Sequence, residues 1–350
     1  MRLATKCIQQ GALPYENIES ATRMVAKLFE KVPSLLLLPR VFEGDTLVNR
    51  TLSKFPGVEF VNNDIVLNVS SSNYKKHLSK LEKAFNHPKL ENLEYFSISS
   101  PFMEKFLQMI KKFNSQNAVV SLLGPFTISQ MLMNVADEQM LTDKSFRKLF
   151  IQGVCVKALW VIEKIKAVNP NTVPIIIFEE PALGQLGLLK RQNEDITIDL
   201  VTALFTRVVE KIKEHGAIVG IQCLGKCDWT VPINAGVDII SYDAYNNPNN
   251  LCIIPEAVEE FLRRGGMINW GIVPVASEQI IKSLTIDSLS KRFFATLQGV
   301  INAGVSAELL YSSALVSIQG SVDNLPIIFA EKAVILSTQL AKKIPVVVIN

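Results

Sequence analysis

The 350-residue sequence has no long apolar run and no cluster of basic residues. Its amino-terminal MRLATKCIQQ lacks the apolar core of a secretory signal peptide, and no run reaches the roughly 18 to 20 apolar residues that cross a bilayer. Lysine and arginine are dispersed and the formal net charge is only +3, so nucleic-acid binding is not indicated. We therefore expect a cytoplasmic protein that contacts neither a membrane nor a nucleic acid.

Cysteine and histidine are also scarce. The five cysteines are odd in number and widely scattered, which argues against a secreted disulfide framework and for reduced thiols. The chain has only three histidines, His77, His87 and His215. Neither a G-x-G-x-x-G pattern nor a P-loop follows any apolar run, so a doubly wound nucleotide-binding sheet is disfavoured.

What the chain does have is a regular alternation of strand-like apolar runs and helical patterns. Eight such runs lie at 4–9, 35–38, 118–123, 173–178, 217–221, 237–242, 267–270 and 307–310. Helical patterns occur between or after them at 18–31, 127–135, 143–168, 196–214 and 325–342. Eight strands, each followed by a helical connection, predict an α/β fold: one (β/α)8 TIM barrel spanning residues 1–350.

Residues 41 to 115 interrupt this alternation. Within them, residues 58–69 are typical of a β-hairpin around Asn62-Asn63-Asp64, and residues 74–85 are typical of a charged helix. We predict that this segment is an insertion near the mouth of the barrel.

Polar side chains follow several of the predicted strands. Gln222 and Cys223 follow the fifth run, Asp243 follows the sixth, and Glu179-Glu180-Pro181 follows the fourth. Parallel strands deliver such residues to one rim, at the carboxyl ends of the strands, where barrels build their sites. The sequence therefore predicts a shared pocket at that rim.

The phrases at these strand ends resemble a known family. GALPYENIESA, GPFTISQML, FEEPAL, VGIQCLGKCDW, AGVDIISYDAYN and GMINWGIVP, in that order, are similar to the cobalamin-independent methionine synthase C-terminal family, within the uroporphyrinogen decarboxylase superfamily of (β/α)8 barrels. The resemblance extends from about residue 8 to 340 and is weakest between 41 and 115.

The resemblance implies methyl transfer to a thiol such as homocysteine from a folate or corrinoid donor, with zinc binding the thiol as thiolate. The family's zinc ligands, a His-x-Cys, an acid and a last Cys, fall on Gln222 and Leu224, Asp243, and about Ala314. Cys223 lies between Gln222 and Leu224, so strand alternation points its side chain away from theirs. His215 lies roughly 20 Å from Gln222, at the opposite end of the strand. We therefore predict no zinc, because a neutral amide and one carboxylate do not replace an imidazole and two thiolates.

Other positions match the family better. The resemblance implies that Glu179 holds the amino group of an amino-acid substrate and that the backbone at Gly11 and Ala12 receives its carboxylate. Trp270, at a strand end, is expected to line the pocket. For Arg40, a role in binding the carboxylate of a ligand and that of an ordinary surface charge are equally consistent with the sequence. We thus assign Asp243 and Glu180 as candidate catalytic residues and predict that substrate is bound by Gly11, Ala12, Glu179, Gln222, Cys223 and Trp270.

Two classes of function remain open. The first is an enzyme, either a methionine-synthase-like methyltransferase with altered chemistry or a decarboxylase of the superfamily's other branch. The second is a barrel that has lost catalysis and binds a small ligand such as an amino acid. The decarboxylase is the weaker enzyme reading, because that branch has an Arg-rich segment where this chain has GALPYEN.

Overall fold

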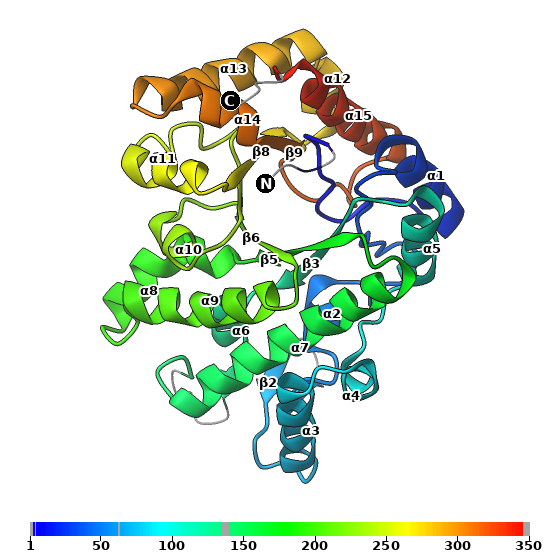
Figure 1. Cartoon of the computed structure of the whole chain (residues 1–350), viewed down its shortest axis with the longest axis vertical. Helices are drawn as coiled ribbons and strands as arrows, with labels where there is room; N and C mark the ends of the chain where they lie inside the picture. The colour runs from blue at the N-terminus through cyan, green and yellow to red at the C-terminus, as the bar shows by residue number, and fades with distance from the viewer. Residues whose placement is uncertain (1–2, 4, 62–63, 135–139, 346–350) are drawn as a thin grey trace.

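A six-stranded parallel sheet forms the centre of the molecule (Figure 1). The computed structural model describes residues 3, 5–61, 64–134 and 140–345. The strand order is β3-β5-β6-β7-β8-β9, so each strand lies beside its successor in the chain. The strands are β3 (Asn117–Leu123), β5 (Val173–Glu179), β6 (Ile218–Cys223), β7 (Ile239–Tyr242), β8 (Met267–Val273) and β9 (Ala314–Ile318).

The two predicted amino-terminal strands are present only as isolated bridges. Cys7 bridges Val316 of β9, and Ser34 bridges Val119 of β3, in both cases in the parallel sense. Ala12 and Leu37 form a third parallel bridge between the two segments themselves. Ala4, where the first predicted strand begins, lies outside the described residues. The fold is thus a parallel half-barrel sheet of the TIM type, and the predicted eight regular strands are reduced to six.

Side chains alternate between the inside of this curved sheet and its helical coat. The inner side holds a small apolar cluster contributed by alternate strand residues: Ile8, Val32, Val119, Ile175, Ile177, Ile218, Ile239, Met267 and Leu315. A much larger apolar cluster lies between the sheet and the helices. The same alternation places Glu179, Gln222, Ser241 and Asn269 on the inner side of the sheet, nearer the carboxyl ends of the strands.

Helices follow the strands and cover the outer side of the sheet (Figure 1). They are α1 (Ile18–Leu28), α6 (Pro125–Met131), α7 (Lys144–Val168), η2 (Pro181–Gln185), α8 (Leu186–Gln192), α9 (Ile198–Lys213), α10 (Thr230–Asn234), α11 (Pro255–Arg263), α12 (Glu278–Ser283), α13 (Ile286–Asn302), α14 (Ala307–Ser313) and α15 (Ile327–Lys343). The six predicted helices correspond to α1, α3 (Tyr74–Asn86), α6, α7, α9 and α15. The prediction over 127–135 is too long, because α6 ends at Met131 and Met133–Asn134 form a short strand; Val135 itself lies outside the described residues.

The segment 41–115 folds on the outside of the sheet. It contains α2 (Leu47–Leu52), α3 (Tyr74–Asn86), α4 (Leu90–Leu93), η1 (Glu94–Phe96) and α5 (Met103–Phe113). The predicted hairpin is confirmed as β1 (Val58–Val61) paired antiparallel with β2 (Asp64–Leu67), which also pairs with β4 (Met133–Asn134). Its predicted turn residues Asn62 and Asn63 lie outside the described residues. Helices α3, α4 and α5 pack on α7, where buried Lys157 donates to the Ser53 carbonyl at 2.6 Å.

The predicted eighth strand at 307–310 is wrong. Residues Ala307–Ser313 form α14, and the Ser306 hydroxyl caps this helix by accepting from the Leu309 N–H. The strand follows at Ala314–Ile318. Ala314, which pairs with Ile268, therefore lies at the amino end of β9 rather than at the functional rim.

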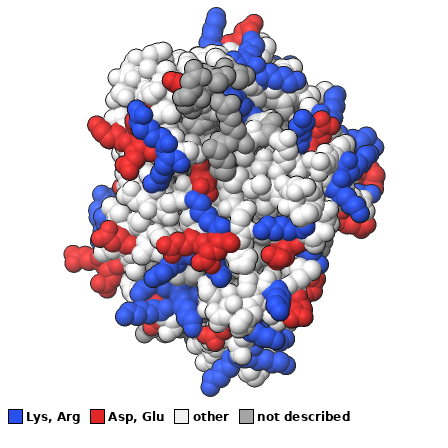
Figure 2. Space-filling view, in the orientation of Figure 1, with Lys and Arg blue, Asp and Glu red and all other residues white. Residues whose placement is uncertain are grey.

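The surface carries both signs of charge. Lysine and arginine side chains are interspersed with aspartate and glutamate over the face shown in Figure 2. Among the described residues, no helix is long and apolar enough to cross a membrane.

Candidate ligand-binding site at the carboxyl ends of the strands

Three of the predicted site residues share the inner rim of the sheet. Glu179 at the end of β5 is the register partner of Gln222 on β6, and Gln222 is the partner of Ser241 on β7. Asp243 follows Ser241 by two residues and so returns to the same face. Since neighbouring strands are about 4.8 Å apart, Glu179, Gln222 and Asp243 form a continuous polar row.

Glu179 is half-buried, and its environment favours the neutral carboxyl. Burial raises its pKa to about 7, against a hydrogen bond from Ser121 and the charge of Arg50, which both act to lower the pKa. Within the described residues, the buried Oε1 has no hydrogen-bond partner. A buried, unpaired carboxylate oxygen is costly, so this atom is available to a ligand that brings its own donor.

Asp243 is held in place by three donors. Its Oδ1 accepts from the Asn246 backbone N–H at 2.9 Å, and its Oδ2 accepts from the Asn246 and Gln319 side-chain amides, each at 2.8 Å. Gln319, which directly follows β9, was not among the predicted site residues, because the last strand was predicted too early in the chain. The run Ala314-Leu-Val-Ser-Ile ending at Gln319 was the signal that could have located it.

A layer of neutral polar side chains lies below the rim. Gln10 Oε1 accepts from the Ser241 hydroxyl at 2.9 Å and from Asn269 Nδ2 at 2.7 Å, and the same Asn269 amide donates to Ser317 at 2.9 Å. All four side chains are buried. This layer lies between the apolar floor of the sheet and the acidic rim.

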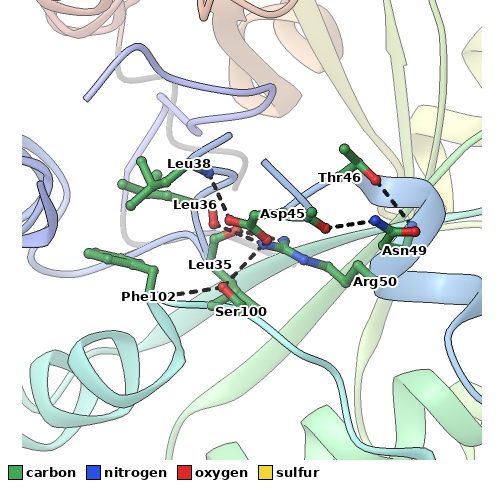
Figure 3. A network of polar contacts seen from close by, with 10 residues as sticks. Leu35, Leu36, Leu38, Asp45, Thr46, Asn49, Arg50, Ser100 and Phe102 are labelled. Atoms are coloured by element: carbon green, nitrogen blue, oxygen red, sulfur yellow. Dashed lines mark hydrogen bonds and ion pairs between the residues drawn. The ribbon is translucent and has the colours of Figure 1, made fainter. Parts of the chain in front are cut away.

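A fully buried ion pair between Asp45 and Arg50 lies near Glu179. Figure 3 shows this pair and its hydrogen-bond partners. Arg50 of α2 pairs with Asp45 at 3.0 Å and donates to the carbonyls of Leu35 and Leu36. Asp45 Oδ2 also accepts from the Leu38 N–H at 2.8 Å. This pair was not predicted from the sequence. It ties the second amino-terminal segment to the start of the segment 41–115 and places a positive charge near Glu179.

Glu180 is turned away from the inner face, contrary to its predicted catalytic position. Its carboxylate caps α6, accepting from the Phe126 N–H at 3.0 Å, the Thr127 N–H at 2.7 Å and the Thr127 hydroxyl at 2.6 Å. Burial raises its pKa to about 7, although these hydrogen bonds act in the opposite direction. Any Cβ at Gly124 would lie 2.0 Å from the carboxylate, so the Gly-Pro that starts α6 makes room for this cap.

Trp270 does not line the pocket, so that prediction is wrong. It is fully buried on the outer side of β8, with its ring 5.4 Å from that of Tyr242 and 6.2 Å from that of Phe293 in α13. The strand extends to Val273, so Trp270 lies in its middle. The neighbouring Asn269 is the residue that faces the inner side of the sheet. The error follows from placing the end of the strand three residues early.

Cys223 also points outward, as the alternation argument predicted. Its sulfur lies 3.5 Å from the position that a Cβ would take at Gly184, and it contacts the Gly225 carbonyl at 3.7 Å. A hydrogen bond from Cys227 lowers the pKa of Cys223, while burial raises the pKa of Cys227 well above its usual value. The two thiols are thus a local pair outside the rim, and the predicted role of Cys223 in substrate binding on the inner side is not supported.

The amino-terminal positions are already engaged. The Ala12 N–H donates to the Ser321 hydroxyl at 3.0 Å, and Gly11 has a φ of +78° with its backbone packed against Ser321. Gly11 lines a cavity of about 10 Å³, the size of one water, between the first two segments and β3. The Arg40 guanidinium donates to the carbonyls of Asp323 and Leu325, so it ties two loops together.

The rim does not fit the family's zinc site. Gln222 and Asp243 are on the inner face, but Leu224 is 41% exposed and its Cδ1 lies beside Gly320, after β9. Both Asp243 oxygens accept hydrogen bonds from protein amides. His215 lies at the amino end of β6, next to Glu163. Within the described residues no three His, Cys, Asp or Glu side chains are grouped as metal ligands.

No family model matches the chain, and no curated protein matches it. Among solved structures, it is similar to a B12-independent methionine synthase from Shewanella sp. W3-18-1 in complex with selenomethionine, at 16% sequence identity over 71% of this chain and 70% of that chain, with a TM-score of 0.45. It is also similar to a Bacteroidetes-affiliated GH5 cellulase, at 9% identity over 72% of this chain and 75% of that chain, with a TM-score of 0.42. Both TM-scores lie below 0.5, so neither likeness assigns an activity to this chain.

Proposed function

We propose that the inner rim binds a small amino acid or related amine through Glu179 and that the chain is a methionine-synthase-like barrel without the zinc-dependent step. The observation that carries this proposal is the buried Glu179 Oε1, which lacks a protein partner within the described residues. An ammonium group offers three donors and a positive charge, so it satisfies that oxygen and stabilises the carboxylate. The motif FEEPAL, whose first acid is Glu179, supports the same ligand class.

The proposal excludes zinc-activated thiol methylation on chemical grounds. Zinc sites use thiolates and imidazoles, whereas this rim offers an amide, an aspartate held by three amide donors, a leucine and a second amide at Gln319.

A second candidate function rests on the raised pKa of Glu179. A carboxylate whose pKa is about 7 is suited to accept a proton from a bound substrate near neutral pH. A metal-free proton transfer at the rim, as the first step of an altered transferase reaction, would use the same residue. It requires the ligand's acidic proton, rather than its amine, to reach Oε1.

We further propose that the described sheet and the two amino-terminal segments form one closed eight-membered barrel domain with 41–115 as its insertion. The bridges from Cys7 to β9 and from Ser34 to β3 support this arrangement, because they place the two segments between the two edge strands. The bridge between Ala12 and Leu37 supplies the remaining junction.

The test is calorimetric titration with methionine and with its des-amino analogue 4-(methylthio)butanoate. We expect methionine to bind and the analogue to bind far more weakly. Glu179→Gln should weaken methionine binding about 10- to 100-fold, the range for a hydrogen bond to a charged group. The exposed Glu194→Gln serves as the matched control and should have no effect. Equal binding of both ligands, or unchanged binding by Glu179→Gln, would contradict the proposal.

A further inference from the structure

A second cavity lies outside the sheet, next to the loop that follows β6. Its volume is about 720 Å³, within the range typical of small-molecule sites. It is bounded by η2 and α8, by the loop 226–229, and by the segment before α11. Figure 1 shows α8 and α10 on the same side of the molecule, away from the centre of the sheet. The cavity lining contains none of Glu179, Gln222 and Asp243, so the cavity does not overlap the inner rim.

The cavity walls are largely apolar. They are formed by Leu183, Leu186, Leu188, Ile198, Trp229, Ile253 and Ile254. Leu188 is 49% exposed and Ile253 is 75% exposed, although their neighbours in the wall are buried or half-buried. Such exposed side chains around a concave apolar surface gain stability when an apolar group covers them.

Two buried N–H donors in the wall lack acceptors. Trp229 is only 1% exposed, and its Nε1 has no hydrogen-bond partner in the described part of the chain. The Asn250 Nδ2, also in the cavity lining, is buried and equally without a partner there. Leaving such donors unpaired costs free energy, so a ligand that brings an acceptor is favoured at this place.

The charge around the cavity is positive. Lys190, Arg191 and Lys226 line it, and within the described residues none of the three forms an ion pair. Asp228 is the one acidic residue in the described lining, and its Oδ1 already accepts from the Thr230 N–H and hydroxyl. The lining thus combines an apolar wall, two free donors and an excess of cations.

We propose that this cavity is a binding site for a small molecule with an apolar body and a carboxylate. The apolar body lies against the leucine and isoleucine walls, and the carboxylate accepts from the buried donors with the three cations nearby. The site is independent of the amine-binding function proposed for the inner rim. It favours an anionic ligand, whereas the inner rim favours a cationic amine.

The test uses octanoate as the probe and octan-1-ol as its neutral counterpart. We expect saturable one-site binding of octanoate in calorimetry, at least about ten-fold tighter than octan-1-ol, because the three nearby cations attract the carboxylate and not the neutral alcohol. Octanoate should also change the tryptophan fluorescence of the wild type. Trp229→Phe should lose this change while Trp160 and Trp270 remain.

Gly187 offers a matched pair of blocking variants. A Cβ added there meets nothing within 4 Å, and the residue lines the cavity. Gly187→Ala should bind octanoate like the wild type, whereas Gly187→Phe should fill the space and weaken binding by about ten-fold or more. A Lys190→Gln, Arg191→Gln, Lys226→Gln triple variant should lose the preference for octanoate over octan-1-ol, with Lys144→Gln as the remote control.

Absence of saturable octanoate binding, or equal affinity for the alcohol, overturns the proposal. Unchanged binding by a folded Gly187→Phe variant overturns it as well. If that variant does not fold, the triple charge variant decides, and an unchanged preference for octanoate then rejects the site. Circular dichroism of each variant establishes whether it is folded.

Discussion

At the residue scale, strand alternation decided which of the predicted site residues share the inner face of the sheet. Glu179, Gln222 and Asp243 were placed on one rim from sequence because each follows an apolar run, and the register pairs agree. Glu180 and Trp270 were assigned to the same pocket, but each is one residue away from an inward-facing position, so its side chain faces the outer side of the sheet. A terminal strand residue and its neighbour face opposite sides, and sequence alone does not show where the strand ends.

The raised pKa of Glu179 gives a prediction for ligand binding. The ammonium ligand requires the carboxylate form, which gains population as the pH rises through about 7. Methionine affinity should therefore increase between pH 6 and pH 8 in calorimetric titrations. Glu179→Gln should show weak binding that does not change over this range, and a flat profile for the wild type would contradict this account.

The pKa of Glu180 gives a separate prediction for stability. Its folded pKa of about 7 lies above the unfolded value near 4.5, so the folded state binds more protons between these values. The contribution of Glu180 to stability is therefore fully present below pH 4.5 and is lost as the pH rises through 7, on the order of 3 kcal/mol in all.

Urea unfolding of the wild type and of Glu180→Gln at several pH values measures this effect. The variant has a neutral amide whose oxygen still accepts from the Phe126 and Thr127 N–H groups, so its stability should match that of the wild type most closely at low pH, where Glu180 is protonated. Its unfolding free energy should fall less between pH 4.5 and 7. Parallel profiles for the two proteins would assign the pH dependence to other groups.

At the element scale, the largest error concerned the last strand. Residues 307–310 are apolar enough to be assigned as a strand, but Ser306 starts a helix there and Glu308 lies in its first turn. The β-branched and leucine residues of β9 follow directly, so two apolar elements adjoin without a turn signal between them. Because of this junction, Ala314 was expected at the rim after the last strand, whereas the structure has Gln319 there. The amino-terminal segments were assigned as strands for a similar reason, since apolar runs do not reveal how many ladder bonds form.

The buried pair of Asp45 and Arg50 should stabilise the junction between α2 and the segment Leu35–Leu38. Asp45→Ala leaves the Arg50 guanidinium without its partner in a site with no solvent access, which costs about 3–5 kcal/mol. The Asp45→Ala, Arg50→Met double variant should be less destabilised than the sum of the single variants, because it removes the stranded charge. Chemical denaturation of the set measures this, and strict additivity would contradict a coupled pair.

At the scale of the whole molecule, the sequence predicted an α/β barrel-like arrangement and the structure has a six-stranded parallel half-barrel sheet. Continuous apolar runs indicate strands that are buried on both faces, so the sheet could be predicted from the sequence. The neutral layer formed by Gln10, Ser241, Asn269 and Ser317 could not, because single polar residues within apolar runs give no information on their partners. The segment 41–115 was expected to be irregular, but its packing on α7 depends on contacts distant in sequence.

Our central proposal is that the acidic rim of this half-barrel sheet binds an amine and holds no zinc. The most direct measurement is the elemental analysis of protein purified without chelators, with and without added zinc. We predict no stoichiometric zinc in the wild type, and about one zinc per chain in a Gln222→His, Leu224→Cys, Gln319→Cys variant, which supplies the ligands that zinc prefers at the rim. One tightly bound zinc per wild-type chain that is lost in Asp243→Ala would contradict the claim.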